Sequence, residues 1–174
     1  MYRILRTLLL AGACLPVFAH EAVAPPAPAQ ALDVFGAVEQ RLAIKADDLR
    51  AFPAAQQVVL QLPGRDPAPG APSQVKGVRL RDILERAKLV VRDHNTVKKL
   101  AIIASASDGY KAVFSWNELF NSELGASALV LYERDGKPLG AGEGPLALVS
   151  GKDIRTGPRH VKWLQSIEVR QIVE

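Results

Sequence analysis

The hydrophobic and polar positions of the chain change in short runs, which predicts a domain built from short strands. Runs of four to eight β-rich or apolar residues between turn residues are typical of strands. Such runs occur at residues 57–62, 100–104, 110–114, 128–134 and 145–149, and residues 42–44 are predicted to form a shorter strand. A last strand runs from Val161 to Val169, and its pattern shifts phase near Gln165, as expected at a β-bulge.

Three helices are predicted between these strands. Apolar residues recur at i, i+3, i+4 and i+7 from Leu80 to Ala87, with charged residues on the other side, which is typical of an amphipathic helix of about three turns. Ser115 and Glu118 form a capping box at the start of a short helix that ends at Phe120. Residues 46–52 suit a third helix. The predicted fold class is therefore α+β, with mixed sheets and a few short helices.

Turn residues connect several of the predicted strands. The sequence Ser-Asp-Gly at 107–109 predicts a hairpin between 100–104 and 110–114, and Asp135-Gly136 predicts a second tight turn. Residues 63–76 contain four Pro and two Gly and are predicted to form a long polar loop.

The first 19 residues have the pattern of a secretory signal peptide. Arg3 and Arg6 precede an apolar core that is too short to span a bilayer, and small residues end at Ala19. An Ala/Pro-rich leader at 20–31 follows, and the folded domain is predicted at 32–174. The protein is therefore expected to be periplasmic.

Cleavage of that signal changes the charge and the thiol content of the chain. The full chain carries 22 basic and 18 acidic residues, and the mature chain would keep 20 basic residues, too small an excess to indicate nucleic-acid binding. The single cysteine, Cys14, lies within the signal, so the mature chain would have no thiol for a disulfide or a thiolate metal site. A lipid anchor at Cys14 is the alternative.

Several catalytic chemistries have no support in the sequence. The three histidines, at positions 20, 94 and 160, form no metal-binding motif, and there is no Gly-x-Ser-x-Gly nucleophile motif. The glycines at 140, 142 and 144 precede a proline and a strand rather than a helix, so they do not form a dinucleotide-binding loop.

A basic loop at residues 150–163 is the strongest candidate for a binding site. Its cationic or potentially cationic side chains are those of Lys152, Arg155, Arg159, His160 and Lys162. Arginine binds phosphate and carboxylate groups through two parallel hydrogen bonds, so the loop could hold an anion. The alternative is a solvated loop without a ligand.

Aromatic and acidic residues suggest that the ligand contains a ring. Trp116 and Trp163 offer flat apolar surfaces, and Asp108 could accept hydrogen bonds from ring N–H groups. Two of these residues also have a structural explanation, because Trp163 fits a core strand and Asp108 fits a turn.

The order of five short motifs resembles the molybdopterin-binding domain of the sulfite oxidase family. The motifs occupy residues 77–84, 107–110, 135–139, 143–146 and 157–163. The resemblance runs from about residue 42 to 169 and implies the mixed α+β fold of that family. It also implies an anionic pterin cofactor held by basic and polar loop residues.

One departure from the family affects its chemistry. The resemblance implies that catalytic members bind molybdenum through a cysteine after an early strand, and Leu62 takes that position here. Molybdenum is therefore not expected, whereas a pterin or molybdopterin-like ligand is. The expected ligand-binding residues are Arg65, Asp108, Tyr110, Trp116, Arg155, Arg159, His160 and Lys162.

The function expected from the resemblance is that of an exported, non-catalytic protein that binds a pterin or a similar ligand. Some small cysteine-less relatives resemble periplasmic pterin-binding proteins that act on a membrane-bound signalling enzyme. Two alternatives stay open. The chain could be a molybdopterin-dependent oxidoreductase or its subunit, or a ligand-free interaction module for a membrane-bound signalling or redox partner.

Overall fold

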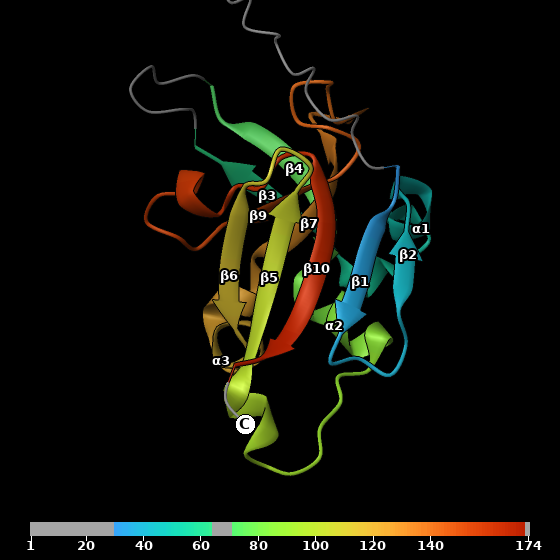
Figure 1. Cartoon of the computed structure of the whole chain (residues 1–174). Coiled ribbons are helices and arrows are strands. Elements are labelled where there is room, and N and C mark those ends of the chain that lie inside the picture. The colour runs from blue at the N-terminus through green and yellow to red at the C-terminus, as the bar shows by residue number, and fades with distance from the viewer. Residues whose placement is uncertain (1–29, 64–70, 173–174) are drawn as a thin grey trace, which may run out of the picture.

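Two five-stranded sheets form the framework of the domain (Figure 1). The computed structural model describes residues 30–63 and 71–172. The first sheet has the order β2-β1-β10-β5-β6. Its strands are β1 (Leu32–Gly36), β2 (Leu42–Ile44), β5 (Leu100–Ala106), β6 (Lys111–Ser115) and β10 (Leu164–Gln171). β1 is parallel to β10, and the other pairs are antiparallel.

The second sheet is antiparallel throughout and supplies most of the site described below. β3 pairs with β4, β4 with β7, and both β8 and β9 pair with β7. Its strands are β3 (Gln57–Leu62), β4 (Ser73–Arg79), β7 (Ala128–Arg134), β8 (Lys137–Pro138) and β9 (Ala147–Ser150). Because β4 runs opposite to β3 and β7, the end of β3, the start of β4 and the end of β7 share one edge of the sheet.

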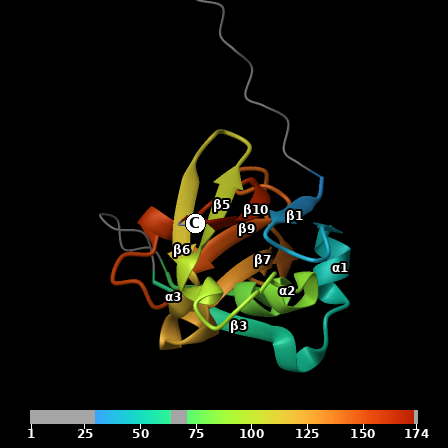
Figure 2. The same ribbon diagram turned by 60° about the horizontal axis from the view of Figure 1, so that its bottom comes forward.

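Short helices connect and cover the sheets. The α-helices are α1 (Ala46–Arg50), α2 (Leu80–Ala87) and α3 (Trp116–Phe120). The 3₁₀ turns are η1 (Ala54–Gln56), η2 (Thr96–Lys99), η3 (Glu123–Ala126) and η4 (Gly157–Arg159). Figure 2 shows α2 next to β7, which it contacts together with β4, α3 and β1. No helix in the described part of the chain is both long and apolar enough to cross a membrane.

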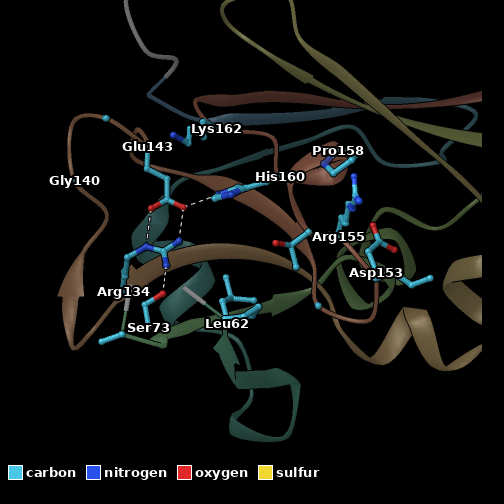
Figure 3. A pocket seen from close by; sticks show the side chains of 17 residues that line it. Leu62, Ser73, Arg134, Gly140, Glu143, Asp153, Arg155, Pro158, His160 and Lys162 are labelled. Carbon is cyan, nitrogen blue, oxygen red and sulfur yellow. Dashed lines mark hydrogen bonds and ion pairs between the residues drawn. The ribbon is translucent and has the colours of Figure 1, made fainter. Parts of the chain in front are cut away.

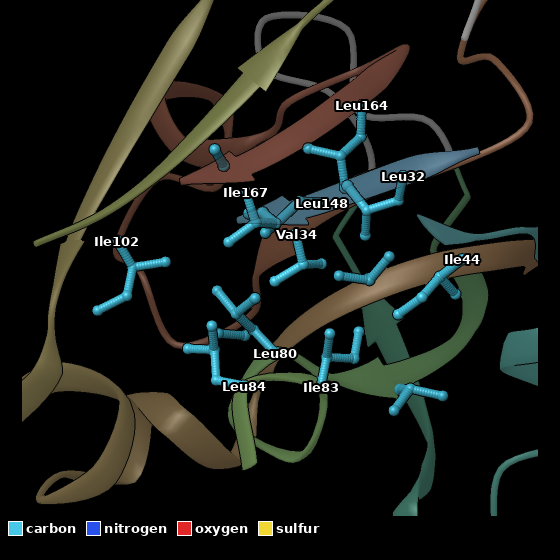
Figure 4. Packing of buried hydrophobic residues seen from close by; sticks show 14 of the residues in the cluster. Leu32, Val34, Ile44, Leu80, Ile83, Leu84, Ile102, Leu148, Leu164 and Ile167 are labelled. Carbon is cyan, nitrogen blue, oxygen red and sulfur yellow. The ribbon is translucent and has the colours of Figure 1, made fainter. Parts of the chain in front are cut away.

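The main hydrophobic core joins the two sheets through α2 (Figure 4). Leu80, Ile83 and Leu84 of α2 are fully buried against side chains such as Val34 of β1 and Leu148 of β9. Burying one such side chain contributes roughly 1.5–3 kcal/mol. The amphipathic pattern of this helix is thus explained by a buried face.

A smaller hydrophobic cluster covers the opposite face of the second sheet. It contains Leu62, Val75, Leu129, Leu131, Ala147 and Val149. β7 therefore contributes alternate residues to both clusters, with Val130 in the main core and its neighbours Leu129 and Leu131 in the smaller one. Burial on both faces explains why this strand is a continuous apolar run rather than an alternating one.

The predicted α+β fold class is confirmed, and most of the predicted elements occur near the expected positions. β2, β3 and β7 have the predicted bounds, and both predicted hairpin turns are present. The predicted bulge lies between Leu164 and Ser166. The predicted capping box at Ser115 is also formed.

Four expectations are corrected by the structure. β1 and β4 were not expected, and β4 begins at Ser73, inside the stretch 63–76 predicted to be loop. β4 was missed because Lys76 and Gly77 interrupt its few apolar residues. Glycine occurs at position 77 because β4 approaches β7 closely there. β10 begins at Leu164 rather than Val161, because Trp163 has a φ of +46°, which extended strands do not adopt. α2 has eight residues, closer to two turns than to three.

We expect Gly77→Ala to destabilise the protein. A Cβ at this position would lie 2.3 Å from the carbonyl oxygen of Val130, so β4 and β7 must separate to admit it. Overpacking of this kind costs about 1–3 kcal/mol. Chemical denaturation of the variant should show this loss, and Gly140→Ala is the control because nothing lies within 4 Å of the added Cβ. Equal stability of the two variants would contradict the close approach.

Candidate ligand-binding cavity

A cavity of about 1120 Å³ opens at the shared edge of β3, β4 and β7 (Figure 3). Leu62 at the end of β3, Ser73 at the start of β4 and Arg134 at the end of β7 line one side. Two loops line the rest: the segment between β8 and β9, and the basic loop between β9 and β10. The second sheet therefore supplies the floor of the cavity, and the loops supply most of its polar groups.

The carboxylate of Glu143 organises the polar floor of the cavity. Arg134 donates from Nε to Oε2 over 2.9 Å and from its terminal nitrogen to Oε1 over 2.7 Å. Nε2 of His160 lies 2.8 Å from the same Oε1, and another Arg134 nitrogen donates to the hydroxyl of Ser73. Figure 3 shows these side chains pointing toward one another from four different segments. The network thus links β4, β7 and both loops.

The burial of Glu143 affects the pKa of its carboxyl and the strength of its attraction to Arg134. Burial alone would raise the pKa of the carboxyl, but the hydrogen bonds from His160 and Arg134 outweigh it and lower the pKa to about 2. The side chain is only 12% exposed, so the attraction to Arg134 is weakly screened by water. Glu143 is therefore ionised at neutral pH and holds both partners in place.

Two cationic side chains that line the cavity are not used in such contacts. Arg155 and Lys162 have no hydrogen bond or ion pair with any other described residue. In Figure 3, Lys162 lies on the side of Glu143, Arg155 lies on the side of Asp153, and His160 lies between them. The cavity therefore presents two cations that are available to a ligand.

Arg159 anchors the basic loop to the first sheet. Its Nε donates to Asp153 over 2.7 Å as part of a two-pronged contact, and its Nη1 donates to Glu118 over 2.8 Å. Its guanidinium lies 4.7 Å from the ring centre of Phe114, a cation–π contact. The hydrogen bond with Asp153 is the main reason that the pKa of Arg159 is raised above its ordinary value. This side chain is held in place by the protein itself.

Glu118 connects that anchor to α3. One carboxylate oxygen accepts the backbone N–H of Ser115 over 2.7 Å, which completes the capping box, and the other accepts from Arg159. Burial opposes ionisation of Glu118, but these hydrogen bonds lower its pKa overall. The helix cap and the basic loop thus depend on the same side chain.

The segments at 140–144 and 161–164 hold each other through Trp163. Its indole N–H donates to the carbonyl of Ala141 over 2.9 Å, and its backbone N–H donates to the carbonyl of Glu143 over 2.8 Å. Gly144 has a φ of +85°, and a Cβ there would lie 2.9 Å from the Trp163 Cα, so only glycine fits. Trp163 therefore positions Glu143 and Lys162 instead of offering a free aromatic surface.

The structure brings some of the predicted site residues together and separates others. Arg155, His160 and Lys162 line the cavity, whereas Arg159 does not and instead binds Asp153, which does. Asp108 accepts the backbone N–H of Tyr110 within its turn.

The aromatic candidates lie outside the cavity lining. Tyr110 donates its hydroxyl to the carbonyl of Pro158 over 2.7 Å. Trp116 stacks on Phe120 with a ring-centre distance of 5.1 Å and packs against the main core. Arg65 lies outside the described residues.

Sequence reasoning missed the floor of the cavity. Arg134, Glu143, Ser73 and Asp153 were not among the candidates. Only Glu143 had a usable indication, because it begins one of the five motifs that carry the family resemblance. The others come together only through pairing of β3, β4 and β7 and closure of the loop.

Comparison with known proteins identifies the family. Residues 21–173 match the oxidoreductase molybdopterin binding domain, and the chain belongs to this family. None of the curated proteins compared with it matches. Among solved structures it is similar to the sulfane dehydrogenase SoxCD from Paracoccus pantotrophus, with a TM-score of 0.61 and 18% identity. The similarity covers 81% of this chain but only 38% of that one, and it shows the fold.

A molybdopterin cofactor would have a metal part and an organic part. The residues that line the cavity fit these two parts differently. Leu62, at the position where the family's metal-binding cysteine is expected, places an apolar side chain in the lining. Within the described ranges no three His, Cys, Asp or Glu residues are grouped as metal ligands. The donor set therefore does not fit molybdenum bound through a protein thiolate, whereas Arg155, Lys162 and His160 fit a polar, anionic organic group.

We expect Glu143→Gln to lower the stability of the protein in a pH-dependent manner. The carboxyl has an ordinary pKa of 4.5 when unfolded and about 2 when folded, a difference worth about 3 kcal/mol. This stabilisation is present above pH 4.5 and is lost as the pH falls toward 2. Denaturant unfolding between pH 7 and pH 2 should therefore show a gap between wild type and variant that narrows with acid.

Glu133→Gln is the matched control for this experiment. Glu133 lies on the same strand, one residue before Arg134, and its side chain makes no ion pair with another described residue. Parallel pH profiles for wild type and Glu143→Gln would contradict the assigned role of the carboxylate.

Proposed function

We propose that this chain is an exported, non-catalytic binding protein for a pterin or a pterin-like ligand. The observation that carries the proposal is a cavity in a molybdopterin-binding domain that keeps available cations but has Leu62 at the expected metal-ligand position. A leucine side chain cannot coordinate a metal ion. Binding of the organic part of a molybdopterin cofactor therefore requires no group that the chain lacks. Metal-based catalysis would require a metal ligand that Leu62 does not supply.

Arg155 and Lys162 are the proposed contacts for anionic or polar edges of the ligand. Both line the cavity without an acidic partner among the described residues, so a ligand anion would neutralise them. An anion would not need to break an existing ion pair, as it would at Arg159 or Arg134. The proposed role of Arg159 is to position the loop through Asp153 and Glu118.

The surfaces available to a ligand ring differ from those expected of an aromatic cage. No Trp, Tyr or Phe side chain is among the described residues that line the cavity. The flat groups present are the imidazole of His160, the ring of Pro158 and exposed backbone at glycines. We therefore propose ring contacts with these groups in place of stacking on Trp116.

A protein partner is part of the proposal, because one apolar side chain at the cavity rim is fully exposed. Ile154 has no cover from any described residue and neighbours Arg155. An isolated isoleucine on an anchored loop is a suitable contact for another protein. A membrane-bound signalling or redox protein would be the partner of an exported binding protein.

Binding of a reduced pterin is the first test of this function. We expect tetrahydrobiopterin to bind wild-type protein saturably in anaerobic isothermal titration calorimetry. Arg155→Ala and Lys162→Ala should each weaken binding by about tenfold, since a charge-assisted hydrogen bond contributes about 1.5–3 kcal/mol.

Lys152→Ala is the matched control for these variants. Lys152 belongs to the same loop, pairs with Glu123 at 3.7 Å and does not line the cavity. Absence of heat with wild type, or equal losses in all three variants, would refute the proposed site.

Metal analysis of natively purified protein tests the non-catalytic part of the proposal. We expect molybdenum well below one equivalent, because Leu62 supplies no thiolate ligand. Native mass spectrometry of the same sample should show a mature chain that begins at His20, the product of signal cleavage after Ala19. Stoichiometric molybdenum would instead support an oxidoreductase function, and a Leu62→Cys variant would show whether a thiol at this position increases metal retention.

A further inference from the structure

The glycines of the described chain fall into groups with different physical explanations. Gly36, Gly77, Gly125 and Gly144 are required because an added Cβ would lie less than 3 Å from backbone or from Trp163. Gly109 and Gly136 have positive φ in hairpin turns. Gly151 would meet the end of the Leu60 side chain at 2.8 Å. The first six of these are explained by the fold, whereas a Cβ at Gly151 would be obstructed closely only by the flexible end of that leucine.

Three glycines have no such explanation. Nothing lies within 4 Å of a Cβ added to Gly140, Gly142 or Gly157, and none of them has a left-handed φ. An alanine at such a position would typically stabilise a protein by about 0.4–1 kcal/mol, because it restricts the unfolded chain. The fold therefore gives no reason for glycine at these positions and gains from replacing it.

All three of these glycines line the cavity. Gly140 and Gly142 belong to the loop that carries Glu143, and Gly157 belongs to the basic loop at the start of η4. They therefore come from two different loops, one on each side of β9, and what the three share is that they line the same cavity.

We propose that Gly140, Gly142 and Gly157 are ligand-contact positions, at which the ligand lies directly against the backbone. This inference rests on the proposed binding function and identifies the residues that set its specificity. Glycine is the residue that lets a ligand approach the main chain most closely. The two walls would then admit a flat ligand, and a side chain on either wall would narrow the space for it.

The backbone at Gly142 also offers polar groups to such a ligand. Neither its N–H nor its C=O has a hydrogen-bond partner among the described residues. By contrast, the carbonyl of Gly140 already accepts from the N–H groups of Glu143 and Gly144. A ring edge that carries both a donor and an acceptor, such as a cyclic amide, would satisfy the two groups at Gly142.

The residue between the two first glycines provides an internal comparison. Ala141 is exposed like its neighbours but does not line the cavity, and its carbonyl accepts from the indole of Trp163. Glycine thus occurs on both sides of a residue that does not line the cavity, as expected if the cavity selects against side chains.

The test compares Gly142→Leu and Gly157→Leu with Ala141→Leu. Titration of tetrahydrobiopterin by anaerobic calorimetry should show at least about tenfold weaker binding in both glycine variants and near wild-type affinity in Ala141→Leu. Thermal unfolding should give similar midpoints for all three variants, because nothing lies within 4 Å of a Cβ added at position 142 or 157. Gly142→Ala should be at least as stable as wild type and show a smaller loss of affinity.

The outcomes separate this inference from the function on which it rests. If wild type and Ala141→Leu bind the pterin and the glycine variants bind equally well, the glycines are merely loop residues and the inference is wrong. If wild type itself does not bind, the proposed function fails and this inference fails with it. If the glycine variants lose thermal stability together with affinity, a structural role of these glycines explains the weaker binding and the inference is again overturned.

Discussion

The buried carboxylate of Glu143 is the interaction on which the cavity depends. It holds Arg134 at the end of β7 and His160 in the basic loop, and Arg134 in turn contacts Ser73 at the start of β4. Removing one partner from a buried pair is costly because the other is left without compensation. The floor of the cavity is thus held together by charge, whereas the sheet below it is held together by apolar packing.

The basic side chains of the cavity perform different tasks even though they share a loop and a charge. Arg159 is engaged by Asp153, Glu118 and Phe114, and it ties the loop to the cap of α3. Arg155 and Lys162 make no comparable contact with described residues. A protein that must bind an anion needs both kinds, because an unanchored loop would lose entropy on binding and an already paired cation would first have to be released.

Family membership and the cavity contents together separate fold from chemistry. The chain belongs to the oxidoreductase molybdopterin binding domain family and is similar in fold to part of the sulfane dehydrogenase SoxCD structure. Activity depends on particular side chains in a site, and the apolar Leu62 lines the cavity at the position where the resemblance places a cysteine. The open positions at Gly140, Gly142 and Gly157 support the proposal that the cavity binds an organic group.

Local pattern by itself determined much of this protein. The amphipathic face of α2, the apolar run of β7, the capping box at Ser115 and the hairpin turns follow from spacing and backbone preference, so the α+β class was predictable. The basic loop was predictable from its composition. Only the tertiary structure decided which cations are free, because pairing of Arg159 with Glu118 joins residues 41 positions apart. It also decided that Arg134, Ser73 and Glu143 meet at one edge of a sheet, since no local preference specifies contacts between distant strands.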